Sequence, residues 1–100
     1  MHLFIRSVRA KHAASVPPAI RFASGICDYV NKTYHVKMRF GVEVFGHPKI
    51  NWMIDFESVD AALAMNQKMM ADPEYHALLE KANDLWVMGS MKDRLIRMAP

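Results

Sequence analysis

The segment from residue 36 to residue 57 restricts the possible fold more than any other part of the chain. Its two strand-like runs are separated by Gly46-His47-Pro48, residues typical of a hairpin loop. If Phe45 pairs with Lys49, every even-numbered position outward from the loop is apolar. This face pairs Val44 with Ile50, Val42 with Trp52, Phe40 with Ile54 and Met38 with Phe56. A shift of one residue would place apolar side chains opposite polar ones, so the sequence predicts an antiparallel hairpin with one buried face.

The odd-numbered face of the same hairpin is mostly polar and contains two pairs of opposite charge. It pairs Glu43 with Asn51, Gly41 with Met53, Arg39 with Asp55 and Lys37 with Glu57. Opposite charges across two strands stabilise the pairing by roughly 0.2–1 kcal/mol per pair. We therefore expect this face to meet water or another protein surface.

The rest of the first half predicts one strand and one long helix. Leu3 to Val8 is a short run rich in strand-forming residues. After a link, Pro17 and Pro18 suit the first turn of a helix. Apolar residues then recur at steps of three and four, which indicates an amphipathic helix. They are Ile20, Ala23, Cys27, Val30 and Tyr34, with Phe22, Ile26 and Tyr29 beside them.

The second half predicts a helix in two parts and a final strand. Ser58 is a suitable N-cap, and Asp72-Pro73-Glu74 combines an N-cap, a proline at the first helical position and an acid in the first turn. Apolar residues at helical spacing follow each start. They are Val59, Ala62, Leu63, Met69 and Met70 in the first part, and Tyr75, Leu78, Leu79, Ala82, Leu85 and Trp86 in the second. Gly89 ends the helical region, and Ser90 to Met98 supplies the last strand.

These elements follow the order βαββαβ within a single domain that spans residues 1–100. One hundred residues is the usual size of one domain. With right-handed crossovers, this order gives a ferredoxin-like α+β fold, in which a four-stranded antiparallel sheet carries both helices on one face. The helices would cover the apolar face of the hairpin.

The composition describes a globular chain without a membrane-spanning segment. Hydrophobic residues make up 52% and charged residues 23%, which excludes a disordered chain. No apolar run approaches the roughly 18 residues needed to cross a bilayer. Arg6 and Arg9 interrupt the start, where a signal peptide would need a long apolar stretch, and the lone Cys27 cannot form an internal disulfide. We expect a cytoplasmic protein that does not associate with membranes.

Charge is distributed unevenly along the chain. Residues 1–39 contain seven Lys or Arg against Asp28 alone, whereas residues 40–90 contain three lysines against eight acidic residues. The basic part can attract an anionic partner. Equally, one half can pair with the other half or with a second copy of the chain.

The element order is also that of RNA-recognition modules, but the side chains that such modules need are missing. Leu3 to Val8 is similar to one of their two motif strands, with Phe4 at the position of a stacking aromatic. Lys49 to Phe56 loosely follows the other, whose stacking aromatics correspond to Asn51 and Met53 here. Because base stacking contributes about 1–3 kcal/mol per base, we expect no nucleic-acid binding.

The two-part helical region, with Asp72-Pro73-Glu74-Tyr75 at the start of its second part, resembles the dimeric α+β barrel superfamily. This superfamily includes antibiotic-biosynthesis monooxygenase-like domains, NIPSNAP-type proteins and stress-responsive barrel proteins. The resemblance covers nearly the whole chain and lies in element order, length and this helix break. It implies a homodimer in which two sheets pack face to face. The odd-numbered hairpin face would then lie in the interface, through Lys37, Arg39, Glu43, Met53, Asp55 and Glu57.

The same resemblance implies a ligand in a cleft between the sheet and the helices. Projected onto this chain, the cleft is lined by Phe22, Phe40, Trp52, Asn66, Met69, Tyr75 and His76. These residues suit a small apolar or aromatic molecule, and the simpler alternative is that they only form the core. Monooxygenase-like relatives often carry a histidine in the first half of the second helix, where this chain has Ala64-Met65-Asn66-Gln67. That departure argues against haem ligation and leaves His76 as the candidate catalytic residue.

We expect neither a metal nor a cofactor. No two of the five histidines lie at a metal-ligand spacing with a carboxylate or thiol, and no phosphate-binding glycine loop is present. Three functions remain open. The first is a homodimer that binds a small, largely apolar molecule. The second is a cofactor-independent oxygenase acting on an aromatic or quinone-like substrate, and the third is a domain that only assembles with itself or a partner.

Overall fold

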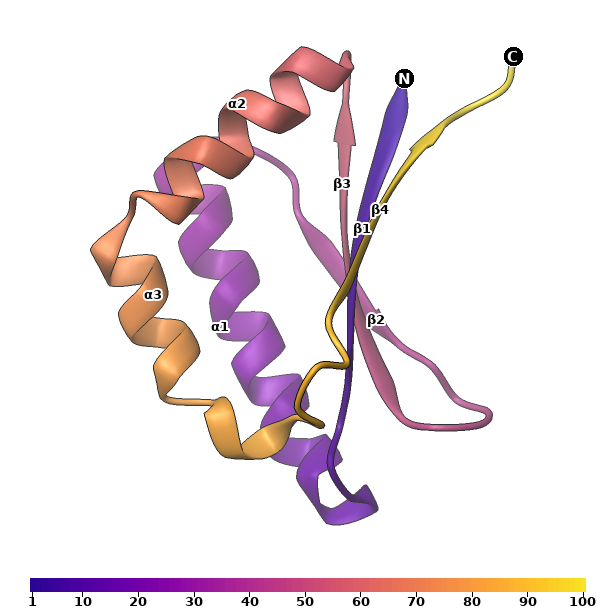
Figure 1. Cartoon of the computed structure of the whole chain (residues 1–100), viewed down its shortest axis with the longest axis vertical. Helices are drawn as coiled ribbons and strands as arrows, with labels where there is room; N and C mark the ends of the chain where they lie inside the picture. The colour runs from indigo at the N-terminus through magenta and orange to yellow at the C-terminus, as the bar shows by residue number, and fades with distance from the viewer.

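The computed structural model describes residues 1–100 and contains a four-stranded sheet with all its helices on one side (Figure 1). The strands are β1 (His2–Arg9), β2 (Arg39–Val42), β3 (Lys49–Phe56) and β4 (Lys92–Arg97), and the helices are α1 (Val16–Tyr34), α2 (Val59–Met70) and α3 (Pro73–Glu80). Short 3-10 helices occupy Ala13–Ser15 and Asn83–Leu85. The strand order is β2-β3-β1-β4, and every neighbouring pair is antiparallel. The predicted α+β, ferredoxin-like class is therefore confirmed.

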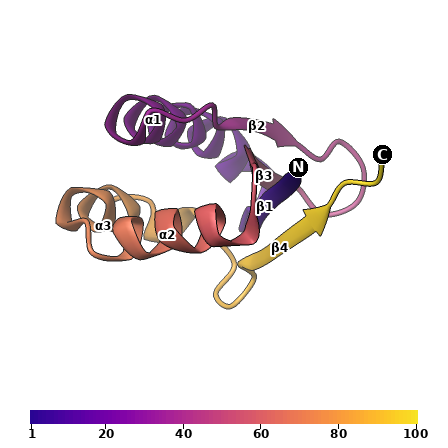
Figure 2. The ribbon, with the colours of Figure 1, turned by 90° about the horizontal axis from the view of Figure 1, so that it is seen from above.

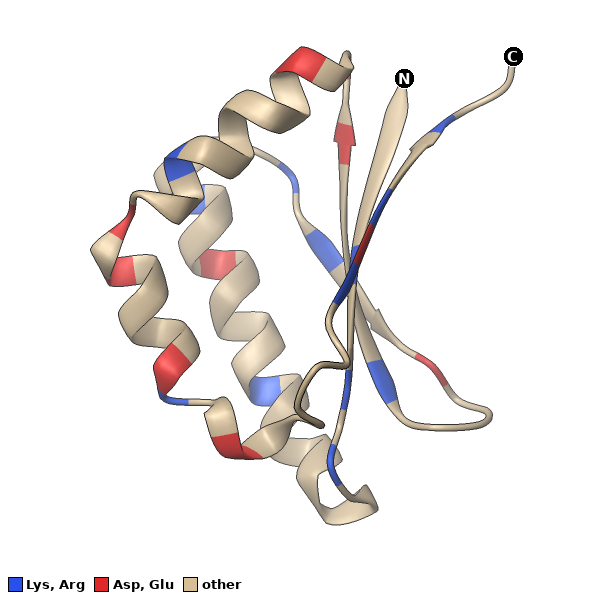
Figure 3. Ribbon diagram, viewed as in Figure 1, with Lys and Arg blue, Asp and Glu red and all other residues tan.

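The helices form one layer over the sheet (Figure 2). In this view α1 lies towards β2, whereas α2 and α3 lie towards β4. Most Lys and Arg residues lie on the strands, whereas several acidic residues lie along α2 and α3 (Figure 3). None of the helices combines the length and the apolar composition that a bilayer-crossing segment requires.

Asp72 joins the two halves of the helix layer. Its carboxylate caps α3 by accepting hydrogen bonds from the backbone N–H of Glu74 at 3.0 Å and of Tyr75 at 3.3 Å. It also accepts the hydroxyl hydrogens of Tyr29 and Tyr34 from α1, both at 2.5 Å. These hydrogen bonds, that from Tyr29 first, lower the pKa of the Asp72 carboxyl. One side chain thus both starts α3 and fastens it to α1.

The β2–β3 hairpin pairs in a register two residues away from the predicted one. Phe40 lies opposite Trp52 rather than Ile54. The loop is longer than predicted, because Val44 and Phe45 leave the ladder and are 85% and 90% exposed. A shift of two residues keeps every side chain on its predicted face, so the pattern of apolar residues cannot distinguish the two registers.

The core lies between the even-numbered face of β3 and the buried side of α1. It includes Ile50, Trp52, Ile54 and Phe56 from β3, and Ala19, Ala23, Ile26, Cys27 and Val30 from α1. Two predicted stripes are corrected. Ile20 on α1 is 39% exposed. On α2, Met69 is buried as predicted and Met65 is buried as well, whereas the predicted core residues Val59, Leu63 and Met70 are 41%, 56% and 67% exposed. The reason is that α2 contacts the rest of the protein through a narrow i, i+4 stripe.

The helical region ends earlier than predicted. The last α-helical residue of α3 is Glu80, and the chain then passes through the short 3-10 helix to an extended Trp86. Trp86 forms an isolated antiparallel bridge with Ala10, just beyond the end of β1. The backbone N–H of Val87 donates to the carbonyl of Arg9 at 2.9 Å. These bonds hold the connection to β4 against the sheet.

Candidate functional site

A cavity of about 730 Å³ lies between the sheet and the helix layer. It is lined by 23 residues, of which 17 are hydrophobic. All but two come from β1, β3, the three α-helices and the segment that leads from α3 to β4. The other two, Lys11 and Met38, lie just after β1 and just before β2. The volume is typical of small-molecule sites, which range from roughly 300 to 1,000 Å³. We call it the sheet–helix cavity.

Three aromatic side chains form one wall of this cavity. Phe22 on α1 packs edge to face against Trp52 on β3 and against Trp86, with ring centroids 6.3 and 5.8 Å away. The two tryptophan rings are 6.1 Å apart in the same kind of contact. The indole N–H of Trp52 donates to the backbone carbonyl of Ala23 at 3.4 Å. This wall is therefore apolar on its surface and fixed in position by its own contacts.

Methionines supply much of the remaining lining. The cavity contacts Met38, Met65, Met69, Met88 and Met91, five of the nine in the chain. Met65 and Met69 are buried, whereas Met88 and Met91 are 97% and 61% exposed and lie at the edge. Because methionine is flexible and polarisable, this lining can adapt to ligands of different shape.

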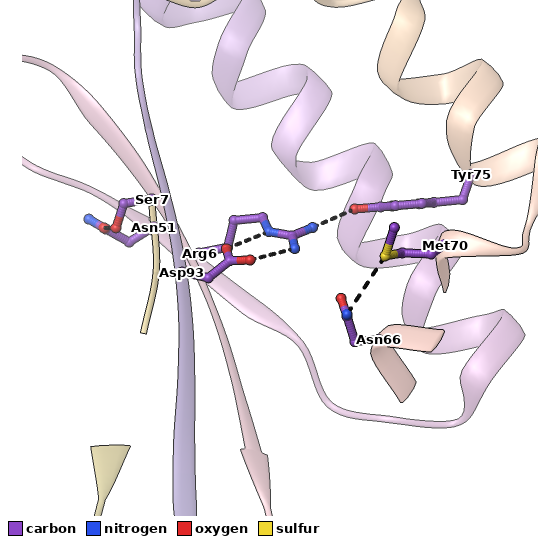
Figure 4. A network of polar contacts seen from close by, with 7 residues as sticks. All are labelled: Arg6, Ser7, Asn51, Asn66, Met70, Tyr75 and Asp93. Atoms are coloured by element: carbon purple, nitrogen blue, oxygen red, sulfur yellow. Dashed lines mark hydrogen bonds and ion pairs between the residues drawn. The ribbon is translucent and has the colours of Figure 1, made fainter. Parts of the chain in front are cut away.

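One charged residue, Arg6, projects from the sheet into the cavity. It stands on β1 opposite Trp52 on β3 and Asp93 on β4. Its guanidinium donates to both carboxylate oxygens of Asp93, from Nε at 2.7 Å and from Nη2 at 2.8 Å. Nη1 donates to the hydroxyl oxygen of Tyr75 on α3 at 3.2 Å. Figure 4 shows Arg6 reaching across to Tyr75, with Ser7 on the other side of the sheet.

Hydrogen bonding and burial keep both Arg6 and Tyr75 protonated. The hydrogen bond with Asp93 raises the pKa of Arg6 further above its ordinary value, so the guanidinium stays charged. Burial raises the pKa of the Tyr75 phenol, against an opposing effect of Arg6. The pair therefore consists of a permanent cation and a neutral hydroxyl near pH 7.

The structure brings five of the seven predicted ligand residues to the cavity. Those that line it are Phe22, Trp52, Asn66, Met69 and Tyr75. Phe40 lies on β2 and packs against the core instead. His76 is exposed on α3, its Nε2 lies 2.7 Å from the backbone carbonyl oxygen of Met70, and it does not line the cavity.

Sequence reasoning missed Arg6 and its partner Asp93. A usable signal was present, because side chains of a strand alternate between its two faces. Phe4 and Val8 are apolar and line the cavity, and Arg6 lies between them on the same face. A charged residue at the centre of an otherwise apolar strand face indicates a functional or ion-paired position.

The opposite, outer face of the sheet holds the predicted interface residues in a different arrangement. Arg39 and Asp55 form an ion pair with 3.3 Å between nitrogen and oxygen, but Arg39 lies directly opposite Met53. The two charged side chains are 52% and 46% exposed, so this contact contributes only about 0–1 kcal/mol. Lys37 and Glu57 precede β2 and follow β3, and no ion pair joins them.

A polar chain crosses the centre of this outer face. The hydroxyl of Ser7 on β1 donates to the side-chain oxygen of Asn51 on β3. The Asn51 amide donates in turn to a carboxylate oxygen of Glu43 at 3.3 Å. Leu3 and Ile5 on β1 continue the face and are only partly buried. The outer face is therefore a mixture of apolar and polar groups.

Cys27 and the histidines form no metal-binding cluster. No three His, Cys, Asp or Glu side chains gather closely enough to hold a metal ion. Cys27 is buried on α1, and burial raises the pKa of its thiol to about 11. The thiol therefore stays protonated and packs as a small hydrophobic group.

No protein-family model matches the sequence. No curated protein matches it either. Solved structures do resemble the fold. An uncharacterised NIPSNAP domain protein from Burkholderia xenovorans has a TM-score of 0.79 at 15% identity, over 99% of this chain and 95% of that one. A NIPSNAP family protein of unknown function from Agrobacterium tumefaciens has a TM-score of 0.74 at 23% identity, over 100% and 92% of the two chains.

A third structure comes from the other group suggested by the sequence. It is a protein from Deinococcus radiodurans proposed to be an antibiotic biosynthesis monooxygenase, with a TM-score of 0.73 at 9% identity, over 100% of this chain and 94% of that one. At these identities the similarity establishes the fold and not the activity. The resemblance to NIPSNAP and monooxygenase-like domains predicted from the sequence is confirmed at that level.

Proposed function

We propose that this chain, which shares its fold with NIPSNAP domain proteins, is a homodimer that binds a small, largely apolar molecule. The observation that carries the proposal is the sheet–helix cavity of about 730 Å³, with 17 hydrophobic residues among the 23 that line it. Protein interiors are normally packed without voids larger than a water molecule. A domain of this size that needed only a core would fill such a space, and a ligand site explains why it is kept.

Native mass spectrometry of freshly purified protein tests this proposal first. A copurifying apolar molecule would add mass, and adding it back should raise the melting temperature. Ala62 lines the cavity, so Ala62→Phe should fill part of it and abolish the added mass. Ala64 on the same helix is exposed, so Ala64→Phe is the matched control and should retain the ligand. If Ala62→Phe retains the same molecule, the ligand binds elsewhere.

The outer face of the sheet supports the dimer part of the proposal. It combines partly buried apolar side chains with the exposed Arg39–Asp55 pair, a composition suited to specific docking of a second copy. Arg39→Glu would place two acids at this position and should weaken dimerisation in sedimentation experiments. Arg21→Glu makes the same charge change at an exposed position on α1 and should leave dimerisation unchanged. A dimer that survives Arg39→Glu at low concentration would exclude this face as the interface.

An enzymatic role is the second candidate. Its support is the fold shared with the proposed monooxygenase, together with the Arg6–Tyr75 pair inside an apolar cavity. A cofactor-independent oxygenase would position an aromatic or quinone-like substrate that itself activates oxygen. Trp52→Ala should then abolish oxygen consumption while the dimer persists, whereas His76→Ala should leave it unchanged because His76 lies outside the cavity. A domain that only assembles would show neither ligand nor turnover.

A further inference from the structure

Of the polar residues that line the sheet–helix cavity, Arg6 and Tyr75 are the two that are not exposed, and they contact each other. The exposed ones are Lys11, Asn66, Asn83 and Asp84. Arg6 has five N–H donors. Asp93 takes two of them and Tyr75 takes a third, which leaves one N–H on each terminal nitrogen without a protein acceptor. The hydroxyl oxygen of Tyr75 accepts from Arg6, and its own hydrogen has no protein acceptor. The Arg6–Tyr75 pair therefore offers three hydrogen-bond donors, and its one acceptor, the Tyr75 hydroxyl oxygen, already accepts from Arg6.

Asp93 neutralises the positive charge at this place from outside the cavity. Its carboxylate binds the guanidinium through two short hydrogen bonds, yet Asp93 is not among the residues that line the cavity. Its side chain is 40% exposed, compared with 20% for Arg6. A second carboxylate entering the cavity would approach this anion and would meet a cation that is already paired. The site thus combines unused donors with little net charge.

We infer that the bound molecule is uncharged and presents a carbonyl-type oxygen, one that accepts but does not donate hydrogen bonds, to Arg6 and Tyr75. This inference rests on the proposed ligand-binding function and specifies the ligand class. The apolar remainder of the ligand lies against the aromatic wall, because Trp52 is the cross-strand neighbour of Arg6. The Cζ atom of Arg6 lies over the ring of Phe4, 5.7 Å from its centroid, and this contact limits the movement of the guanidinium.

Three bicyclic probes of similar size separate the possibilities. They are tetralin, which has no oxygen, 1-tetralone, which has a ketone, and tetralin-1-carboxylate, which is an anion. Binding is measured by calorimetry and by the fluorescence of Trp52 and Trp86, which both line the cavity. We expect 1-tetralone to bind about tenfold more tightly than tetralin, the effect of one or two buried hydrogen bonds. The carboxylate should bind more weakly than the ketone.

Two conservative variants assign the preference to these residues. Tyr75→Phe removes one donor without changing the size of the ring, and should reduce the preference for 1-tetralone over tetralin. Asp93→Asn removes the neutralising carboxylate, and should make tetralin-1-carboxylate the tighter ligand. Asp55→Asn makes the same change in the outer-face ion pair and should leave all three affinities unchanged.

The outcomes distinguish this inference from the function on which it rests. If the wild-type protein binds tetralin-1-carboxylate as tightly as 1-tetralone, the uncharged class is wrong. If all three probes bind equally and Tyr75→Phe changes nothing, Arg6 and Tyr75 do not select the ligand, although the cavity remains a binding site. If no probe binds, the inference and the proposed function both fail.

Discussion

Because of the sheet–helix cavity, two otherwise identical core substitutions should lower the free energy of unfolding by different amounts. Ile50 and Ile54 lie four residues apart on the same face of β3 and are 1% and 3% exposed. Ile54 lines the cavity and Ile50 does not. Ile50→Ala and Ile54→Ala therefore remove the same atoms from the same strand, one from dense packing and one from beside an existing space.

The expected magnitudes follow from the two contributions to such substitutions. Removing three carbons costs about 2.4 kcal/mol of transfer free energy at ~0.8 kcal/mol each. A new cavity adds about 24 cal/mol per Å³, which brings large-to-small core changes to roughly 2–5 kcal/mol. We expect about 4 kcal/mol for Ile50→Ala and about 2.5 kcal/mol for Ile54→Ala, because part of the Ile54 side chain already lacks packing partners. At about 4–8 °C per kcal/mol, the melting temperatures should differ by roughly 6–12 °C.

Urea unfolding followed by far-ultraviolet circular dichroism measures both costs. Protein concentration must be equal in all samples, because dimerisation would couple stability to concentration. Equal losses of free energy in the two variants would refute the reasoning. Such a result would mean that no space lies beside Ile54 in solution and that the proposed ligand site is closed.

Three further predictions concern other parts of the molecule. Hydrogen bonds depress the folded-state pKa of Asp72, so its contribution to stability is present above about pH 4, the unfolded value, and is lost as pH falls through the folded value. Asp72→Asn should therefore flatten the decline of the urea midpoint below that pH, and an unchanged decline would contradict the role given to this carboxylate. Burial raises the pKa of the Cys27 thiol to about 11, so this thiol should react with a disulfide reagent only after unfolding. Rapid labelling of native protein at pH 8 would count against its burial. The third prediction tests the hairpin register. In a Cys27→Ser background, Arg39→Cys combined with Met53→Cys should oxidise readily to a disulfide, because these two positions lie directly opposite each other, and mass spectrometry detects the bond. Failure to oxidise would favour the register predicted from the sequence.

The sequence was sufficient to predict the element order, the buried faces of the hairpin and the start of each helix. These features depend on local signals, such as the proline after Asp72 or the alternation along β3. The register of the hairpin was not predictable in the same way. Alternation has a period of two residues, so pairing Phe40 with Trp52 or with Ile54 buries the same set of side chains. Loop length decides between them, and the loop residues Val44 and Phe45 carry strand-like side chains.

The apolar part of the candidate site was predictable from the sequence. In the polar part only the position of Arg6 left a signal, and its partner left none. Phe22, Trp52 and Tyr75 are large residues on buried faces, so any packing of these elements brings them towards the cavity. Arg6 depends instead on Asp93, which is 87 residues away in sequence and reaches it only because β4 pairs with β1. A partner at such a separation leaves no local pattern, and the pairing of the edge strand β4 with β1 must be known first.

Two methionines at the edge of the sheet–helix cavity also make the protein sensitive to oxidation. Met88 and Met91 are the most exposed thioethers among its lining residues. Peroxides convert such a side chain to the sulfoxide, which is polar and chiral, and reductases reverse the change. Oxidation here would place a strong acceptor oxygen at this edge of the cavity, while the buried Met65 and Met69 stay intact. The proposed binding of an apolar molecule would then depend on whether Met88 and Met91, which take no part in the core, are oxidised.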